Sequence, residues 1–211
     1  INGIAAMTIT WIKAGLVTGL RPVEWLDANW ATKDKKALQT ISAKTKVGQV
    51  AYMKKPHDGL SSQAMQPMLL REIPLLDDAD KEAVDKMLNL ISLRVPGNLS
   101  RAKKQDAFNK LYLAVKQRIY TACKEIYGGK KNYSLYAFRR QFSANSKAAM
   151  GSDVTAELIG HLSAQSPSTG YYGKANQAHG RYKVAGERRR KQEAATASND
   201  KSAQKMTRER G

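Results

Sequence analysis

The chain has 211 residues, of which 36 are Lys or Arg and 18 are Asp or Glu, and its formal net charge is +18. A hydrophobic share of 42% excludes a mostly disordered chain, and the single cysteine, Cys123, excludes an internal disulfide framework and a cysteine-based zinc site. Such an excess of positive charge repels itself unless an anion offsets it, so we expect a nucleic-acid partner.

The first elements are predicted to be two helices with a sharp joint between them. Residues 5–17 form an apolar stretch that stops before Gly19, and glycine is typical of a helix C-cap. Pro22 suits the first turn of a second helix, which continues to Leu26. Arg21 is therefore expected in the joint.

A small antiparallel sheet is expected next. Strand-like composition occurs in residues 38–43, 47–52 and 71–75, and Pro74 suits an edge strand. Residues 54–68 are predicted to form a long loop between the last two strands.

Two stripes of apolar residues then recur at helical spacing and are predicted to face the core. They are Val84, Met87, Leu88 and Ile91, followed by Phe108, Leu111, Tyr112, Val115, Ile119, Ala122 and Ile126. The pair Gly128-Gly129 is expected to end the second helix.

Two further helices are predicted before the tail. Ser134 is a candidate cap for a helix that includes Phe138 and Phe142. A short helix capped by Ser152 or Asp153 is expected to end at Gly160, which places His161 in a loop just beyond it.

We expect one folded domain, residues 1–179, followed by a basic tail, residues 180–211. The tail holds ten Lys or Arg and four Asp or Glu but only one residue, Val184, from the Leu/Ile/Val/Phe set. Because it buries so little apolar surface, we predict that it is flexible. It is either a solvated terminus or a DNA-binding segment whose phosphate contacts come from Arg188, Arg189, Arg190 and Lys191.

No apolar run approaches the roughly 18 residues that suggest a membrane span. We therefore expect no membrane partner and a cytoplasmic location, associated with DNA in the nucleoid. The chain begins at Ile1 rather than Met, so we expect a fragment or a processed chain.

Four short motifs stand in order along the chain. They are Thr18-Gly19-Leu20-Arg21-Pro22-Val23-Glu24, Leu135-Tyr136-Ala137-Phe138-Arg139-Arg140, Leu158-Ile159-Gly160-His161 and Tyr171-Tyr172-Gly173-Lys174. Their order, and the 22 residues from Arg139 to His161, resemble the catalytic domain of the tyrosine recombinases, or phage integrase family, over about residues 5–175. The resemblance implies an α+β fold that is mainly α, with a helical catalytic domain and one small antiparallel sheet.

The same resemblance implies a site-specific recombinase or integrase that breaks and rejoins double-stranded DNA through a 3′-phosphotyrosyl intermediate. Because the covalent link stores the bond energy, such a reaction needs no cofactor and no metal. Family members assemble on DNA with other protomers. Alternatives are a telomere-resolvase-like or type IB topoisomerase-like enzyme, or a non-catalytic basic DNA-binding protein.

Attack on a phosphodiester builds negative charge on the non-bridging oxygens, and two guanidiniums can stabilise it. Arg21 and Arg139 are the candidates, and we expect Arg21→Ala and Arg139→Ala to remove cleavage while preserving the fold. Glu24, three residues after Arg21, is expected either to hold that guanidinium or only to serve as an acid at a helix N-terminus.

In the family a lysine on a β-hairpin protonates the leaving 5′ oxygen. Lys44 matches that position best, and Lys46 is the alternative. The resemblance implies that His161 donates a hydrogen bond to the phosphate, whereas a histidine that caps its helix is the alternative.

Tyr136 stands where the family usually has histidine. Its hydroxyl can still bind a phosphate oxygen, although a phenol is a poorer general base than imidazole. A core aromatic is the alternative interpretation of Tyr136.

The nucleophile is expected to be one of two adjacent tyrosines after His161. Spacing favours Tyr171, whereas the ending Tyr172-Gly173-Lys174 is typical of many integrases. We choose Tyr172 and keep Tyr171 as the alternative.

Overall fold

The computed structural model describes residues 3–42, 70–75, 77–161 and 172–208, with residues 197–208 as backbone alone. The fold is mainly helical with one three-stranded antiparallel sheet, which confirms the predicted fold class. Among the described helices, none has the length and apolar character that a membrane crossing requires.

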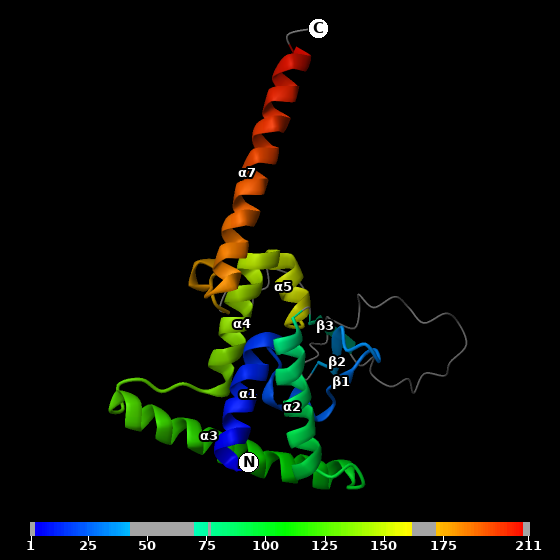
Figure 1. Cartoon of the computed structure of the whole chain (residues 1–211), viewed down its shortest axis with the longest axis vertical. Coiled ribbons are helices and arrows are strands. Elements are labelled where there is room, and N and C mark those ends of the chain that lie inside the picture. Colours follow the sequence, from blue (N-terminus) through cyan, green and yellow to red (C-terminus); the bar gives the residue numbers. More distant parts are fainter. Residues whose placement is uncertain (1–2, 43–69, 76, 162–171, 209–211) are drawn as a thin grey trace, which may run out of the picture.

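Four helices form the body. Helix α1 spans Ile4–Thr18, α2 spans Asp78–Arg94, α3 spans Arg101–Tyr127 and α4 spans Leu135–Met150. Helix α1 packs against the other three, and α3 runs across the ends of α1 and α2 (Figure 1). The core between them is built from large apolar side chains, including Met7, Trp11, Val84, Met87, Phe108 and Val115.

Helix α1 ends where the sequence predicts. Gly19 adopts a left-handed backbone with φ 61°, and its amide donates to the Gly15 carbonyl at 3.0 Å. The ring of Phe142 on α4 lies directly over this turn. A Cβ on Gly19 would be only 2.2 Å from the Cδ1 atom of that ring. Glycine is therefore needed here for two reasons, conformation and space.

We predict that Gly19→Ala lowers the melting temperature more than Gly128→Ala. Both glycines have left-handed φ angles, for which an L side chain costs about 1–2 kcal/mol. Apart from its chain neighbours, no atom of the described residues lies within 4 Å of a Cβ on Gly128. The difference between the two variants therefore reports the contact with Phe142, and thermal unfolding followed by circular dichroism measures it. Equal melting temperatures would show that Phe142 moves aside without cost.

The sheet has the order β1-β2-β3 and is antiparallel throughout. Strands β2, Ala37–Ile41, and β3, Leu70–Pro74, correspond to the first and third predicted strands. Strand β1, Asn29–Trp30, was not predicted because two residues give no readable alternation. The predicted strand at 47–52 and the predicted loop at 54–68 lie outside the described residues.

Three local predictions need refinement. Pro22–Leu26 form a 3₁₀ helix, η1, as the second helical element. Ser134 occupies the N-cap position of α4 but makes no side-chain capping bond. Helix α5, Ser152–Leu158, is capped by Gly151 rather than by either predicted polar residue, and it is followed by Gly160 with φ 65°.

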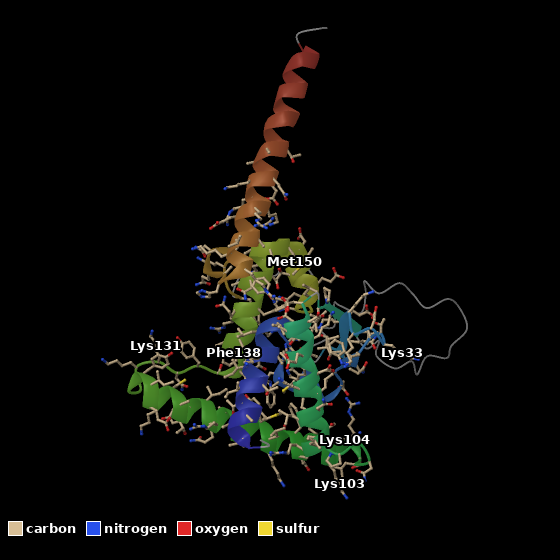
Figure 2. The ribbon with its side chains drawn as sticks, viewed as in Figure 1. Lys33, Lys103, Lys104, Lys131, Phe138 and Met150 are labelled. Atoms are coloured by element: carbon tan, nitrogen blue, oxygen red, sulfur yellow. The ribbon has the colours of Figure 1, made fainter. Side chains whose placement is uncertain are left out.

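The last turn of α3 differs from its predicted core position. Ile126 is 70% exposed, because α3 projects past the helices that cover its middle. The helix then ends at Gly128, as predicted. Lys103 and Lys104 lie near one end of α3 and Lys131 lies beyond the other, all away from the body (Figure 2).

The segment expected to be a flexible tail contains a long helix. After the short η3, Ala175–Gln177, helix α7 spans Arg181–Arg208 and extends away from the body (Figure 1). It packs on α4, where a Cβ on Gly186 would be 2.9 Å from the Ala148 carbonyl oxygen. The prediction counted only apolar side chains, whereas this helix docks through a close backbone approach and polar bonds to the end of α4.

Candidate functional site: an arginine cluster beside a tyrosine

The turn between α1 and η1 is fixed by its own residues. Thr18, the last residue of α1, donates its hydroxyl to the Ala14 carbonyl at 2.7 Å and accepts from the Leu20 amide at 3.4 Å. After the left-handed turn at Gly19, buried Leu20 anchors the chain and Arg21 precedes Pro22. Arg21 thus lies in the joint between two helices, as predicted.

Glu24 is the centre of a buried charge network. Its carboxylate accepts from Arg21 Nη1 at 2.6 Å, from the Arg21 amide at 2.7 Å and from Arg71 Nη2 at 2.7 Å. Arg139 Nη1 lies 3.9 Å from the same carboxylate. Arg21, Arg71 and Arg139 around Glu24 are called the arginine cluster below. Of the two expectations for Glu24, the contact with the Arg21 guanidinium is present.

The arginine cluster has more positive than negative charge. Burial by itself raises the pKa of Glu24, but the three guanidiniums outweigh it and lower that pKa below its usual value. Glu24 is therefore ionised at neutral pH and offsets only one of the three positive charges. Excess positive charge held by buried, preorganised donors is suited to binding an anion.

The two predicted arginines differ in how far their donors are already used. Arg139 is 1% exposed and donates to the carbonyls of Gly19 and Ile159. Its Nε is buried and has no hydrogen-bond partner among the described residues. Arg21 is 5% exposed and donates through Nη1 to Glu24, while its other guanidinium groups have no partner within the described part of the chain. Both side chains therefore keep capacity for an anion.

Tyr172 lies against the arginine cluster, and His161 lies against Tyr172. The guanidinium carbon of Arg139 is 5.3 Å from the centre of the Tyr172 ring, and the ring of His161 meets the same tyrosine edge-on with centroids 5.2 Å apart. The predicted convergence of Arg139, His161 and Tyr172 is therefore present in the fold.

Helix α4 holds the backbone at Tyr172 in place. The Lys147 ammonium donates to the Tyr172 carbonyl at 2.7 Å. At the next residue, a Cβ on Gly173 would be 2.6 Å from the Arg140 carbonyl oxygen, so only glycine permits this approach. The glycine of the Tyr172-Gly173-Lys174 motif thus has a packing reason.

His161 lies three residues after the end of α5, and its amide donates to the Ala156 carbonyl at 2.7 Å. Partial burial, together with Arg139 and the other nearby cations, lowers the pKa of His161 from 6.5 to about 4. The imidazole is therefore neutral at pH 7, with one ring nitrogen that donates a hydrogen bond and one that accepts.

We predict that the ring signals of His161 titrate in NMR with a midpoint near 4, well below 6.5. The unfolded chain binds this proton more readily, so the contribution of His161 destabilises the fold as pH falls from about 6.5 towards 4. His161→Asn assigns the signal. A midpoint near the ordinary histidine value would mean that the nearby cations do not act on this ring.

Tyr136 is 41% exposed on the first turn of α4, so the alternative that it is a core aromatic is wrong. Burial raises its pKa most, Tyr112 and Tyr172 add to the rise, and Arg21 and Arg139 oppose it. Because Arg21, Arg139 and Tyr172 all act on its charge, Tyr136 lies at the edge of the same site.

The remaining predicted residues either lie on α7 or are not described. Lys44, Lys46 and Tyr171 lie outside the described residues. In the predicted DNA-binding segment, Arg189 donates to the Lys147 and Ala148 carbonyls and pairs with Glu193. Arg189 therefore ties α7 to the end of α4, whereas its neighbours Arg188, Arg190 and Lys191 are exposed and make no such contact among the described residues.

Two residues of the site were missed by the sequence analysis, Arg71 and Lys147. Arg71 and Ile73 lie on the same inward face of β3. The position of Arg71 two residues before an apolar strand residue could therefore have predicted a buried, paired charge. Lys147 gave no such signal, because its role depends on the return of the chain at Tyr172.

In the described ranges, no group of three or more His, Cys, Asp or Glu side chains is arranged to hold a metal ion. Comparisons of the chain with protein-family models, with curated proteins and with solved structures give no match.

Proposed function

We propose that this chain breaks and rejoins DNA strands as a recombinase or integrase of the tyrosine recombinase type. The observation that supports this most is the arginine cluster, three guanidiniums around one carboxylate, with a tyrosine against Arg139 and a histidine against that tyrosine. A phosphodiester is the anion that such a group of donors and a nucleophile fits.

The scissile phosphate is proposed to bind at Arg21 and Arg139. Arg21 has guanidinium donors that Glu24 does not use, and Arg139 has an unpartnered buried Nε. Since both arginines are fixed by internal bonds before any phosphate arrives, they stabilise developing charge without reorganising. Lysine would be a poor substitute, because it lacks the planar fork that binds phosphate and internal acceptors together.

Binding requires a local movement at Tyr172. Its ring lies over the Arg139 guanidinium and limits access to it. When a phosphate reaches Arg139, the ring moves off the guanidinium and its hydroxyl comes into line for attack. Tyr172 thus shields Arg139 in the free protein and acts as the nucleophile once the phosphate is bound.

The reaction forms one bond and breaks one. The Tyr172 oxygen bonds to phosphorus, the bond from phosphorus to the 5′ oxygen breaks, and the DNA remains attached through a 3′-phosphotyrosyl link. The tyrosine proton goes to a nearby base, and the leaving 5′ oxygen takes a proton from a general acid, for which the family resemblance implies Lys44. Attack by a 5′ hydroxyl on the link reverses these steps and rejoins a strand.

His161 is the proposed acceptor of the tyrosine proton. Burial and the nearby cations hold its pKa at about 4, which makes the free site a weak base. A bound phosphate brings negative charge close to the imidazole and raises that pKa, because an opposite charge favours the protonated form. The substrate therefore activates its own base.

The test is covalent capture on nicked suicide DNA, in which the cleaved end diffuses away and religation fails. We expect a protein–DNA band that survives denaturant and forms in the presence of a metal chelator. Binding of the DNA without this band, under conditions that keep the protein folded, would support a non-catalytic DNA-binding protein instead.

Binding to DNA is expected to depend strongly on salt and weakly on sequence. The net charge of +18 favours backbone contacts, and counterion release gives a slope of about −0.9 in log K against log salt concentration for each phosphate contacted. Fluorescence anisotropy with duplexes of unrelated sequence at several salt concentrations measures it. An affinity that hardly changes with salt would contradict a nucleic-acid partner.

A further inference from the structure

Arg71 enters the site from the sheet. It lies on β3 opposite Thr40 of β2, and its side chain is buried on the same inward face as Ile73. The Thr40 hydroxyl in turn donates to the Glu24 backbone carbonyl at 2.8 Å. The sheet is therefore attached to η1 by two polar contacts, of which Arg71 provides the charged one.

The guanidinium of Arg71 joins two elements that are far apart in sequence. Its Nη2 donates to the Glu24 carboxylate at 2.7 Å, and its Nη1 donates to the Leu158 carbonyl at 3.0 Å. Glu24 holds Arg21, and Leu158 is the last residue of α5, three residues before His161. The Arg71 guanidinium thus links the carboxylate that holds Arg21 to the end of the helix that leads to His161.

The chain between Leu158 and His161 is fitted closely around Arg71. A Cβ on Gly160 would be 2.8 Å from Ser42 Oγ, 3.0 Å from Arg71 Cδ and 3.1 Å from Arg71 Nη1. Since Gly160 also has a left-handed φ of 65°, the path of the chain into His161 depends on glycine and on the arginine behind it.

We propose that Arg71 is a positioning residue that sets the separation of Arg21 and His161 by bonding to Glu24 and to the end of α5. For its effect on strand cleavage this inference rests on the proposed function, but the tether itself does not. Both terminal nitrogens of Arg71 are used in these two internal bonds, so Arg71 acts through its neighbours and not by contact with the reacting phosphate.

Three variants test this role. Arg71→Lys keeps the charge but loses the fork that reaches two acceptors, and Arg71→Met removes the charge. Ile119→Ala, a buried change on α3 outside the arginine cluster, is the control for lost stability alone. Each variant is made in the full chain and is compared with the wild-type protein at a temperature well below the melting temperature of either.

The first measurement does not depend on cleavage. NMR of the Arg21 guanidinium and of the His161 ring is expected to show shifted or broadened signals in both Arg71 variants and unchanged signals in Ile119→Ala. Wild-type signals in Arg71→Lys would overturn the inference, because charge alone would then suffice. If Arg71→Met does not fold, Arg71→Lys decides.

The second measurement is the single-turnover rate of cleavage at saturating protein, with DNA affinity measured in parallel. We expect both Arg71 variants to cleave about 10–100-fold more slowly, as is typical when a supporting hydrogen bond is lost, while affinity stays near that of the wild type. Rates equal to that of Ile119→Ala would overturn the inference. If the wild-type chain does not cleave at all, the proposed function fails and the NMR result alone decides whether Arg71 sets this geometry.

Discussion

Arg139→Ala is expected to remove strand cleavage and to destabilise the fold at the same time. Loss of one donor to a developing oxyanion typically costs about 10²–10³ in rate. The sequence predicted that the fold would be preserved, but Arg139 is 1% exposed and bonds to the Gly19 and Ile159 carbonyls. Two buried acceptors left unsatisfied cost about 1–3 kcal/mol each, so we expect a large fall in melting temperature.

Arg140→Ala is the matched control, because it removes the same residue type from the next position of α4, where the side chain is exposed. We expect it to retain the melting temperature and the cleavage rate at saturating protein. Thermal unfolding and single-turnover assays measure both effects. An Arg139→Ala protein with wild-type stability would contradict the described contacts, and one with a wild-type rate would contradict its role in the reaction.

Tyr172→Phe is expected to abolish the covalent protein–DNA link and leave stability nearly unchanged. Phenylalanine keeps the ring that lies over Arg139 and meets His161 edge-on, and it lacks only the oxygen that attacks. Denaturing gels of nicked suicide reactions and thermal unfolding provide the two measurements.

Tyr171→Phe is the matched control for the nucleophile, since it makes the same change at the adjacent position. We expect this variant to form the covalent band. Loss of the band with Tyr171→Phe and survival with Tyr172→Phe would reverse the choice of nucleophile. Survival in both would contradict a tyrosine at this motif.

Those features of the fold that depend on local chemistry could be predicted from the sequence. Gly19 and Gly128 end helices because they adopt left-handed backbones, and both were predicted as helix ends. The pairing of Arg21 with Glu24 is equally local, since three residues separate them. Short-range geometry of this kind is encoded within one turn of chain.

Features that depend on contacts between distant segments could not be predicted. Helix α7 packs against α4 through Gly186 and Arg189. Neither residue is apolar enough for the composition of the segment to have predicted this packing. Arg71 joins Glu24 and Leu158, which lie 47 and 87 residues away in sequence. Only the folded chain brings such partners together.

The most direct test of the proposed reaction is the location of the covalent bond in the wild-type protein. The adduct trapped on nicked suicide DNA is digested with nuclease and protease, and fragment ions in mass spectrometry identify the residue that carries the nucleotide. We predict a nucleotide on the oxygen of Tyr172, the ring that lies over Arg139. An adduct at any other residue, or no adduct from folded protein that binds the DNA, would contradict it.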